Sequence, residues 1–311
     1  MKILYLLPKP NKYYPIRDEE FIIQELRNVG EIVIEIKNFF IIQIIFYCFF
    51  YRPNAIIFSS LNIGKKINWF INFFYKIINI PIYWWYFDSA NADSKRASLV
   101  NSIAKNVTIF FNRDKVNFEK YKKNNINPVW LDQAVPNILK IYNNNQNYDY
   151  DVGFFGSMSA VHNTRSNFLK KIDEKFNLVI YSKDKKNFEK KGFKNVKNNV
   201  VKNKIPKLVS KIKIVLVLNS SCSGPYYWSD RIHIMIGSGA FCITQNIQGI
   251  EKTYSPNKHH ILFENENDIF DLINKWVDKD SEREKIRQDG YQHAIKNHSY
   301  NSRVKEFLKQ I

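Results

Sequence analysis

The stretch YYWSDRIHIMIGSGAFCITQ, residues 226–245, places a short helix between aromatic residues and an apolar strand. Ser229 can cap the first turn of that helix, and the carboxylate of Asp230 suits the positive end of the helix dipole. Arg231 falls in the same turn. Free backbone N–H groups and a guanidinium together suit an anion such as phosphate. The same residues also fit a plain helix cap with a surface arginine, so both interpretations stay open on the residues alone.

Outward from this stretch, the first half of the chain alternates apolar strands with helices. The expected strands are residues 2–7, 31–36, 55–60, 81–88, 107–112 and 128–134, and the expected helices lie near 17–28, 39–51, 64–78, 94–105 and 114–124. Strands separated by single helices indicate right-handed crossovers and a parallel sheet covered on both faces.

The polar run NNNQNYDYD, residues 143–151, is the best linker candidate, and the alternation restarts after it. We expect strands at 151–157, 177–182, 212–219, 241–245 and 260–264, with helices near 162–175, 184–191, 205–211, 228–236, 266–276, 281–296 and 300–310. The pattern predicts an α/β fold of two doubly wound, Rossmann-like domains facing a cleft. The predicted parts are an acceptor-side domain (1–145), a donor domain (149–299) and a terminal helix (300–311) that packs back towards the first domain.

The charge of the chain is unevenly distributed. Of a formal net charge of +18, much comes from residues 165–213, which hold 16 Lys or Arg and four Asp or Glu. A solvated lysine-rich face explains such a run, and so does an anionic partner such as a membrane surface, a phosphorylated ligand or nucleic acid.

The cysteines and the apolar segments bear on location. Cys48, Cys222 and Cys242 have no CxxC spacing, so neither a disulfide framework nor a zinc site is indicated. The first apolar run is too short for a signal peptide, and we therefore expect a cytoplasmic protein. The apolar segments 39–51 and 67–80 are shorter than the roughly 20 residues of a membrane span. They fit core helices or helices docked at a membrane surface, which would place the protein at the inner face.

From Tyr226 onward the sequence resembles the carboxyl-terminal, nucleotide-sugar-binding domain of GT-B glycosyltransferases in the "glycosyl transferases group 1" clan, and within that clan the CgeB-like set. The matching elements, in the family's order, are Trp228–Arg231, Gly237 with Gly239, Phe241–Thr244, Gly249–Glu251, His260–Phe263 and His298–Tyr300. The run DVGFFGS at 151–157 adds the Gly-rich first turn. The resemblance covers roughly residues 149–311, whereas the first half matches only in architecture.

The resemblance implies a metal-independent transferase that moves a sugar from a nucleotide sugar to a cell-envelope glycan, a glycolipid or a glycoprotein. The donor is a substrate, and no cofactor is expected. The resemblance implies that Arg231 and the helix start before it bind the diphosphate, and that Glu251, after Gly249, binds the ribose hydroxyls. It also implies that the donor comes close to the first-strand loop. The donor-site residues are therefore Gly156, Ser157, Trp228, Ser229, Asp230, Arg231, Gly249 and Glu251. A glutamate that family members often carry three residues after the arginine is Ile234 here, so the stereochemical outcome is not implied.

Three residues are candidates for catalysis. Arg231 could stabilise the negative charge that grows on the leaving diphosphate. Asp88 ends the strand PIYWWYFD, where a carboxylate could serve as the base that activates an acceptor hydroxyl. An N-cap of the following helix is the alternative interpretation of Asp88. His162 follows the GFFGS turn and is the second candidate for the base, with helix capping or solvent exposure as its alternative.

Two other functions were weighed against glycosyl transfer. A nucleic-acid-binding protein without catalysis could use the basic stretch 165–213. However, the sequence has no helix-turn-helix, zinc-finger or RNA-recognition signature, and we expect no nucleic-acid partner. A dehydrogenase is disfavoured because neither MKILYLLPKP nor DVGFFGSMSA supplies the GxGxxG fingerprint.

Overall fold

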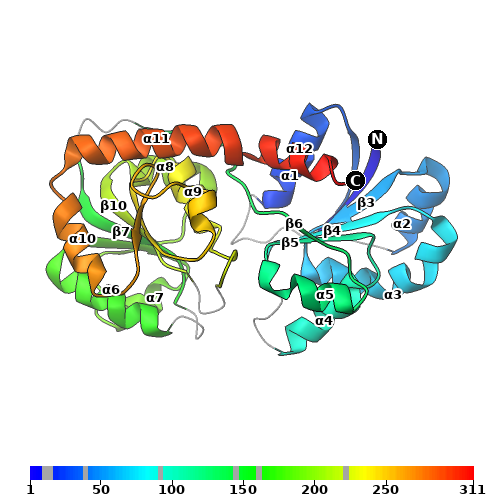
Figure 1. Ribbon diagram of the computed structural model, residues 1–311, viewed down its shortest axis with the longest axis horizontal. Coiled ribbons are helices and arrows are strands. Elements are labelled where there is room, and N and C mark those ends of the chain that lie inside the picture. The colour runs from blue at the N-terminus through cyan, green and yellow to red at the C-terminus, as the bar shows by residue number, and fades with distance from the viewer. Residues whose placement is uncertain (9–16, 38–40, 90–93, 143–146, 159–162, 220–223) are drawn as a thin grey trace. The chain divides into compact units, whose positions relative to one another are not determined.

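The computed structural model describes residues 1–8, 17–37, 41–89, 94–142, 147–158, 163–219 and 224–311 (Figure 1). The chain divides into two compact units. The first unit holds residues 1–133, 225–227 and 303–311, and the second holds residues 134–224 and 228–302.

The first unit is built on a six-stranded parallel sheet in the order β2-β1-β3-β4-β5-β6. Its strands are β1 (Lys2–Leu7), β2 (Ile32–Lys37), β3 (Ala55–Phe58), β4 (Ile82–Tyr86), β5 (Ile109–Asn112) and β6 (Pro128–Trp130). Its helices are α1 (Asp18–Asn28), α2 (Ile41–Phe46) continued by the π-helix η1 (Tyr47–Tyr51), α3 (Leu61–Ile78), α4 (Ser94–Ala104), the 3₁₀ turn η3 (Lys115–Asn117) and α5 (Phe118–Lys123).

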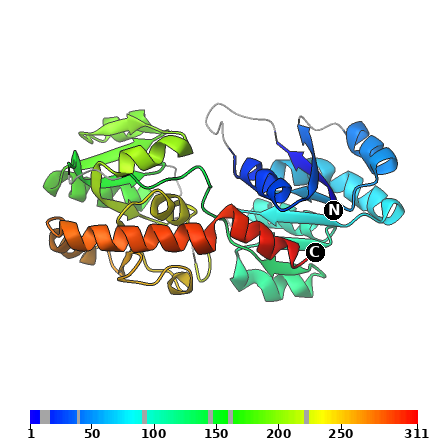
Figure 2. The ribbon, with the colours of Figure 1, turned by 90° about the horizontal axis from the view of Figure 1, so that it is seen from above.

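Alternation along the aromatic strand β4 sends its side chains to both faces of this sheet. Trp84 lies in the core cluster with residues of α2 to α5, and its ring stacks on that of Phe58, with centroids 5.5 Å apart. Trp85 faces the other way, and its ring stacks on that of Phe307, with centroids 5.7 Å apart and planes 7° from parallel. Phe307 belongs to α12 (Tyr300–Leu308), which lies beside α1 on this opposite face (Figures 1 and 2).

The second unit carries another six-stranded parallel sheet, in the order β12-β11-β10-β7-β8-β9. Its strands are β7 (Tyr150–Phe155), β8 (Leu178–Ser182), β9 (Val196–Asn198), β10 (Ile212–Val217), β11 (Cys242–Gln245) and β12 (Ile261–Phe263). Its helices are α6 (Asn163–Lys175), α7 (Lys185–Lys190), η5 (Lys202–Lys204), α8 (Ile205–Val209), α9 (Arg231–Gly237), η6 (Ile250–Lys252), α10 (Asp268–Trp276) and α11 (Asp280–His298). Helices α6, α7 and α10 cover one face, and α8, α9 and α11 cover the other (Figure 1).

The strand order of the second sheet is that of a classical dinucleotide-binding fold, in which the direction of the crossovers reverses between the first and fourth strands. These strands are β7 and β10, which pair directly, with Phe154 opposite Leu216. Ligands of such sheets bind beyond the carboxyl ends of the strands at this switch point. The two sheets thus confirm the predicted α/β class with two Rossmann-like domains.

The segment before the predicted linker packs in the second unit. The backbone N–H of Val135 donates to the carbonyl oxygen of His298 at 2.7 Å. A Cβ at Gly237 would lie 2.3 Å from a methyl group of Val135, so the glycine is needed for this approach. The second unit therefore begins at Ala134, whereas the sequence places the division at 143–151. Part of that polar run, 143–146, lies outside the described residues.

The predicted strands and helices of the two sheets are present, and two differences concern β9 and the helix expected at 39–51. Strand β9 was not predicted, because it is only three residues long and lies in the lysine-rich stretch. The helix expected at 39–51 begins at Ile41 among the described residues and changes to π-helical geometry at Tyr47. Among the described helices, none has both the length and the apolar character needed to cross a bilayer.

Candidate functional site

Arg231 lies at the carboxyl edge of the second sheet. A guanidinium N–H of Arg231 donates to the carbonyl oxygen of Leu218, just after β10, at 2.7 Å. The same guanidinium lies over the ring of Phe154 on β7, with the Cζ atom 5.8 Å from the ring centroid. Arg231 therefore contacts both strands that flank the switch point.

A second arginine, Arg165, reaches the same place from α6. Its guanidinium donates to the carbonyl oxygens of Leu218 at 3.3 Å and Asn219 at 2.7 Å. Its Cζ atom lies 5.5 Å from the centroid of the Phe154 ring, the ring that Arg231 also covers. We call Arg165 and Arg231 the arginine pair.

Sequence reasoning missed Arg165 because it counted this residue only as the first member of the basic stretch. In that stretch, every lysine is exposed or half-exposed, whereas Arg165 is buried. The available signal was position: Arg165 stands two residues into the helix that follows the Gly-rich first turn, where the backbone of a Rossmann-like domain meets anions.

The arginine pair has an electrostatic cost, which the nearby carboxylate of Asp230 offsets only in part. Burial, together with the nearby charge of Arg231, lowers the pKa of Arg165 to about 9. Burial also lowers the pKa of Arg231, although the charge of Asp230 acts in the opposite direction. Within the described part of the chain, neither guanidinium forms an ion pair; each is satisfied by carbonyl oxygens. Two like charges, one buried and one half-buried, without an ion-pair partner make a site suited to an anion.

Asn219 adds a donor at the end of β10. Its side-chain oxygen accepts the backbone N–H of Ser229 at 2.7 Å, and its backbone N–H donates to the side chain of Gln245 at 3.2 Å. The Nδ2 amide of Asn219 is buried and has no hydrogen-bond partner among the residues that the structure describes. A buried amide donor without a partner is costly, and an acceptor on a bound ligand would satisfy it.

The predicted residues Gly156 and Ser157 lie in this site. A Cβ at Gly156 would be 2.6 Å from the Phe154 ring, so glycine is required for the ring to come this close, and it would lie 3.5 Å from Cζ of Arg231, an ordinary contact distance. The carbonyl oxygen of Ser157 accepts from the guanidinium of Arg165 at 3.4 Å. The first-strand loop and the arginine pair thus form one arrangement.

The helix start differs from the prediction. Helix α9 begins at Arg231, later than expected, and Asp230 is its N-cap without a side-chain capping bond. Ser229 still contributes, since its hydroxyl oxygen accepts the backbone N–H of Arg231 at 3.3 Å. The backbone N–H of Ser229, ahead of the helix, donates to the side chain of Asn219. Trp228 is buried in the second unit.

Glu251 follows β11, the neighbour of β10 in the sheet. Gly249 has a φ of 99°, a conformation that favours glycine, and begins the turn that carries Glu251. One carboxylate oxygen of Glu251 accepts the backbone N–H of Gly249 at 2.8 Å. Glu251 is exposed, so its other oxygen can meet a hydroxyl group of a ligand.

Asp88 lies in the first unit, two residues beyond β4, and is exposed. Its carbonyl oxygen accepts from the side-chain amide of Asn112 at 3.2 Å. The charge of Asp88 contributes to raising the pKa of Tyr227, although burial is the larger cause. Tyr227 in turn lies under the guanidinium of Arg113, which pairs with Asp132 at 3.1 Å. Asp88 is therefore placed at the carboxyl edge of the first sheet among buried polar groups.

Two predicted features lie outside the described residues, namely His162 and Cys222. The other two cysteines are buried and free. Among the residues that the structure describes, no group of three or more His, Cys, Asp or Glu is arranged to hold a metal ion.

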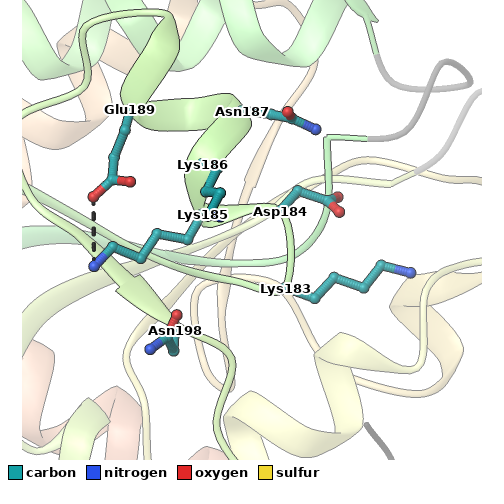
Figure 3. A pocket seen from close by; sticks show the side chains of 7 residues that line it. All are labelled: Lys183, Asp184, Lys185, Lys186, Asn187, Glu189 and Asn198. Atoms are coloured by element: carbon teal, nitrogen blue, oxygen red, sulfur yellow. Dashed lines mark ion pairs between the residues drawn. The ribbon is translucent and has the colours of Figure 1, made fainter.

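The basic stretch forms a solvated surface, and a pocket of about 430 Å³ lies on it beyond β8. Lys183 and Lys185 extend in opposite directions along it, so these lysines do not converge on a common ligand (Figure 3). Lys185 pairs with Glu189 at 3.4 Å. This arrangement does not favour the nucleic-acid-binding alternative.

Comparisons with known proteins agree with this geometry. The glycosyl transferase-like family matches residues 165–309, which include both members of the arginine pair. No curated protein matches the chain.

Solved structures share the fold over the whole chain. HepE of Anabaena in complex with UDP-glucose has a TM-score of 0.71 at 12% identity, with 100% of each chain covered. Sucrose-phosphate synthase of Thermosynechococcus elongatus has a TM-score of 0.74 at 9% identity, covering 99% of this chain and 98% of that one. A glycosyltransferase of Rickettsia africae has a TM-score of 0.68 at 14% identity, covering 99% and 97%. The family match falls on the unit that carries the arginine pair, and the fold of both units is that of GT-B glycosyltransferases, so these findings support a glycosyltransferase of the GT-B, group 1 type.

Proposed function

We propose that the protein transfers a sugar from a nucleotide-sugar donor and that the arginine pair binds the donor diphosphate. The observation that carries this proposal is the placement of two guanidiniums, that of Arg165 buried and that of Arg231 half-buried, without an ion-pair partner among the described residues, at the switch point of the second sheet. The solved structures of HepE with UDP-glucose and with UDP support it by analogy of fold.

The chemistry follows from the charge of the leaving group. When the bond between the sugar and the diphosphate breaks, negative charge grows on the diphosphate oxygens. Fixed cationic donors lower the energy of that transition state because they are already oriented when the charge develops. Arg165 and Arg231 are held in place by carbonyl oxygens at the end of β10. In this proposal, the donor is a substrate, and neither a metal nor a cofactor is needed.

The other donor contacts are assigned by position. Glu251 would accept the ribose hydroxyls, and the helix start at Trp228, Ser229 and Asp230 would line the diphosphate. Gly156 and Ser157 would let the donor approach the first-strand loop. Membership of the CgeB-like set within the clan is part of the same proposal.

The acceptor side is assigned to the first unit. We propose that Asp88, exposed at the end of β4, removes the proton from an acceptor hydroxyl of a glycan, glycolipid or glycoprotein. The enzyme would work in the cytoplasm, with reversible docking at the inner face of the membrane. His162 remains the second candidate for the base.

A thermal-shift screen against UDP, GDP, CMP and dTDP and their sugars tests the donor assignment. We expect one nucleotide diphosphate family to stabilise the protein, and transfer or slow donor hydrolysis with the matching sugar. Stabilisation by none of these compounds would contradict the proposal.

The role of Asp88 is tested separately with Asp88→Asn. Donor binding should be unchanged while transfer is lost, because only the base has been removed. Glu119→Gln, which removes an exposed carboxylate elsewhere in the first unit, is the matched control and should retain transfer. If Asp88→Asn transfers sugar at the wild-type rate, another residue is the base.

A further inference from the structure

Helix α2 and its continuation η1 expose an apolar stripe on the first unit. Its members, which we call the α2 stripe, are Ile42, Phe46, Phe49 and Phe50, with exposed fractions of 79%, 54%, 56% and 78%. The opposite side of the same helix is buried, since Ile44 and Cys48 lie in the core of the unit. The helix is therefore apolar on the face that meets the core and on the face that meets solvent.

The spacing of these residues makes the stripe continuous. Ile42 and Phe46 are four residues apart, and so are Phe46 and Phe50, which places them on one side of a helix. The rings of Phe46 and Phe50 are in contact, with centroids 4.7 Å apart. Scattered apolar residues on a surface are ordinary, but a run of contacting rings on one helix face indicates a partner.

The surrounding sequence carries only positive charge. Residues 36–87 contain no Asp or Glu, and they contain five basic residues: Lys37, Arg52, Lys65, Lys66 and Lys76. Lys65 and Lys66 are exposed on α3, which packs beside α2 on the same face of the sheet (Figures 1 and 2). Trp69, on the same helix, is 63% exposed.

We propose that the α2 stripe, with Lys65, Lys66 and Arg52, docks the first unit on an anionic phospholipid surface. Aromatic side chains enter the boundary between headgroups and acyl chains, while lysines and arginines remain among the phosphates. The segment is too short to cross the bilayer, so it would lie in the interface plane. The proposal does not depend on the donor site, which lies in the second unit.

Charge favours a lipid surface over a second copy of this chain. If two copies joined through the α2 stripe, the positive charges of Arg52, Lys65 and Lys66 in one copy would face those in the other. Residues 36–87 contain no Asp or Glu that could neutralise them. An anionic membrane instead offers the opposite charge over the whole patch.

Co-sedimentation with vesicles tests the proposal. We compare vesicles of phosphatidylcholine alone with vesicles of phosphatidylcholine and phosphatidylglycerol, at low and high salt. The wild type should bind the anionic vesicles, and binding should fade with salt. Phe46→Ser with Phe50→Ser should lower the partition coefficient by about tenfold or more, since each phenyl group contributes to burial in the interface.

Matched controls show whether binding depends on this patch. Val116→Ser removes another exposed apolar side chain of the first unit, 62% exposed, and should leave vesicle binding unchanged. Lys65→Gln with Lys66→Gln should weaken binding to anionic vesicles more than Lys120→Gln with Lys123→Gln, which removes the same charge from α5. Equal effects of the two lysine pairs would overturn the assignment.

Two further outcomes would also overturn it. One is absence of binding to anionic vesicles at low salt. The other is a wild-type protein that elutes as a dimer which the Phe46 and Phe50 substitutions dissociate, without vesicle binding. Nucleotide binding by the same variants, followed by thermal shift, should equal that of the wild type, so that failure of the docking proposal is distinguishable from failure of the donor assignment.

Discussion

Arg165 and Arg231 both donate hydrogen bonds to one carbonyl oxygen, that of Leu218, although they are 66 positions apart and come from different helices. The two guanidiniums are close enough that the charge of Arg231 contributes, after burial, to lowering the pKa of Arg165. Such a pair is unfavourable in the free protein, and a diphosphate that neutralises both charges would bind strongly for that reason.

The arginine pair should discriminate by the number of phosphates. We expect Arg231→Ala to weaken binding of the preferred nucleoside diphosphate by roughly 2–5 kcal/mol and to abolish transfer, because a desolvated charge contact is lost. Arg165→Ala should act in the same direction. Calorimetric titration with the diphosphate and with the monophosphate should show a larger loss for the diphosphate.

The control for these variants is Arg27→Ala, which removes an arginine from a surface ion pair with Glu35 in the first unit. Its nucleotide affinity should equal that of the wild type. If Arg165→Ala and Arg231→Ala lose equal affinity for the diphosphate and the monophosphate, the arginine pair does not bind the diphosphate.

Gly156 should tolerate no larger residue without loss of donor binding. In Gly156→Ala the new methyl group would lie 2.6 Å from the Phe154 ring, so the ring must move, and with it the guanidinium that covers it. We expect weaker diphosphate binding in a protein whose circular dichroism spectrum is unchanged. Gly192→Ala, in an exposed turn of the same unit, is the comparison: its φ of 76° makes an alanine strained there too, but the position contacts neither arginine of the pair, so donor affinity should be retained. If Gly156→Ala binds the diphosphate with wild-type affinity, the close contact between Gly156 and the Phe154 ring is not needed for donor binding.

The fold could be predicted from the sequence because most of the strands are continuous apolar runs. PIYWWYFD and IKIVLVLN can only be buried strands of a sheet covered on both faces, and the structure has β4 and β10 there. Strand β9 is three residues long, and its pairing with β8 depends on the neighbouring strand rather than on its own sequence. Its composition therefore carried no signal.

The site was predictable only in part. The run Trp-Ser-Asp-Arg pointed to an anion site, and the structure brings its arginine to the first-strand loop at Gly156. Arg165 is the one arginine among the lysines of the stretch 165–213, but residue type alone does not place it in the site; what does so is its burial against Phe154 and the end of β10. The helix begins three residues later than predicted, at Arg231, and the hydrogen bond from the N–H of Ser229 to Asn219, ten residues away, is not visible in the local sequence.

Glu251 should recognise the ribose. If its free carboxylate oxygen accepts the ribose hydroxyls, the wild type binds the ribonucleotide more tightly than the 2′-deoxyribonucleotide, and Glu251→Ala loses that preference. Glu251→Gln keeps a side-chain oxygen for the N–H of Gly249 and should retain part of the preference for the ribonucleotide. Affinities for the two nucleotides, measured with each variant, check this. A preference that survives in Glu251→Ala would exclude the assignment.

Removal of divalent metal should leave the reaction unchanged. The charge of the leaving diphosphate is met by two guanidiniums in the proposed site, so a cation is not required for that purpose. We expect the same transfer rate with EDTA as with added Mg²⁺ or Mn²⁺. The comparison should be repeated with Arg165→Ala, in which partial rescue by a metal ion would support the electrostatic role of the arginine. Loss of wild-type activity in EDTA, restored by a metal, would contradict the proposal.

Acid should destabilise the second unit through its histidines. His260 is buried, with a ring nitrogen 2.9 Å from the carbonyl oxygen of Tyr254, and burial lowers its pKa to about 4. Burial and the neighbouring His293 also lower the pKa of His259 to about 4. In the unfolded chain both should titrate near 6.5, so unfolding takes up protons between these values. The free energy of unfolding should therefore fall as the pH falls from about 6.5 to about 4, by at most about 1.4 kcal/mol per pH unit for each histidine.

Carboxylates also titrate in this range, so the informative quantity is the difference in unfolding free energy between the wild type and His260→Gln. The amide of this variant can keep a donor for Tyr254 but does not titrate. Denaturant midpoints measured across this pH range should show a shallower slope in His260→Gln, and identical slopes would mean that His260 is not neutral in the folded protein at these pH values.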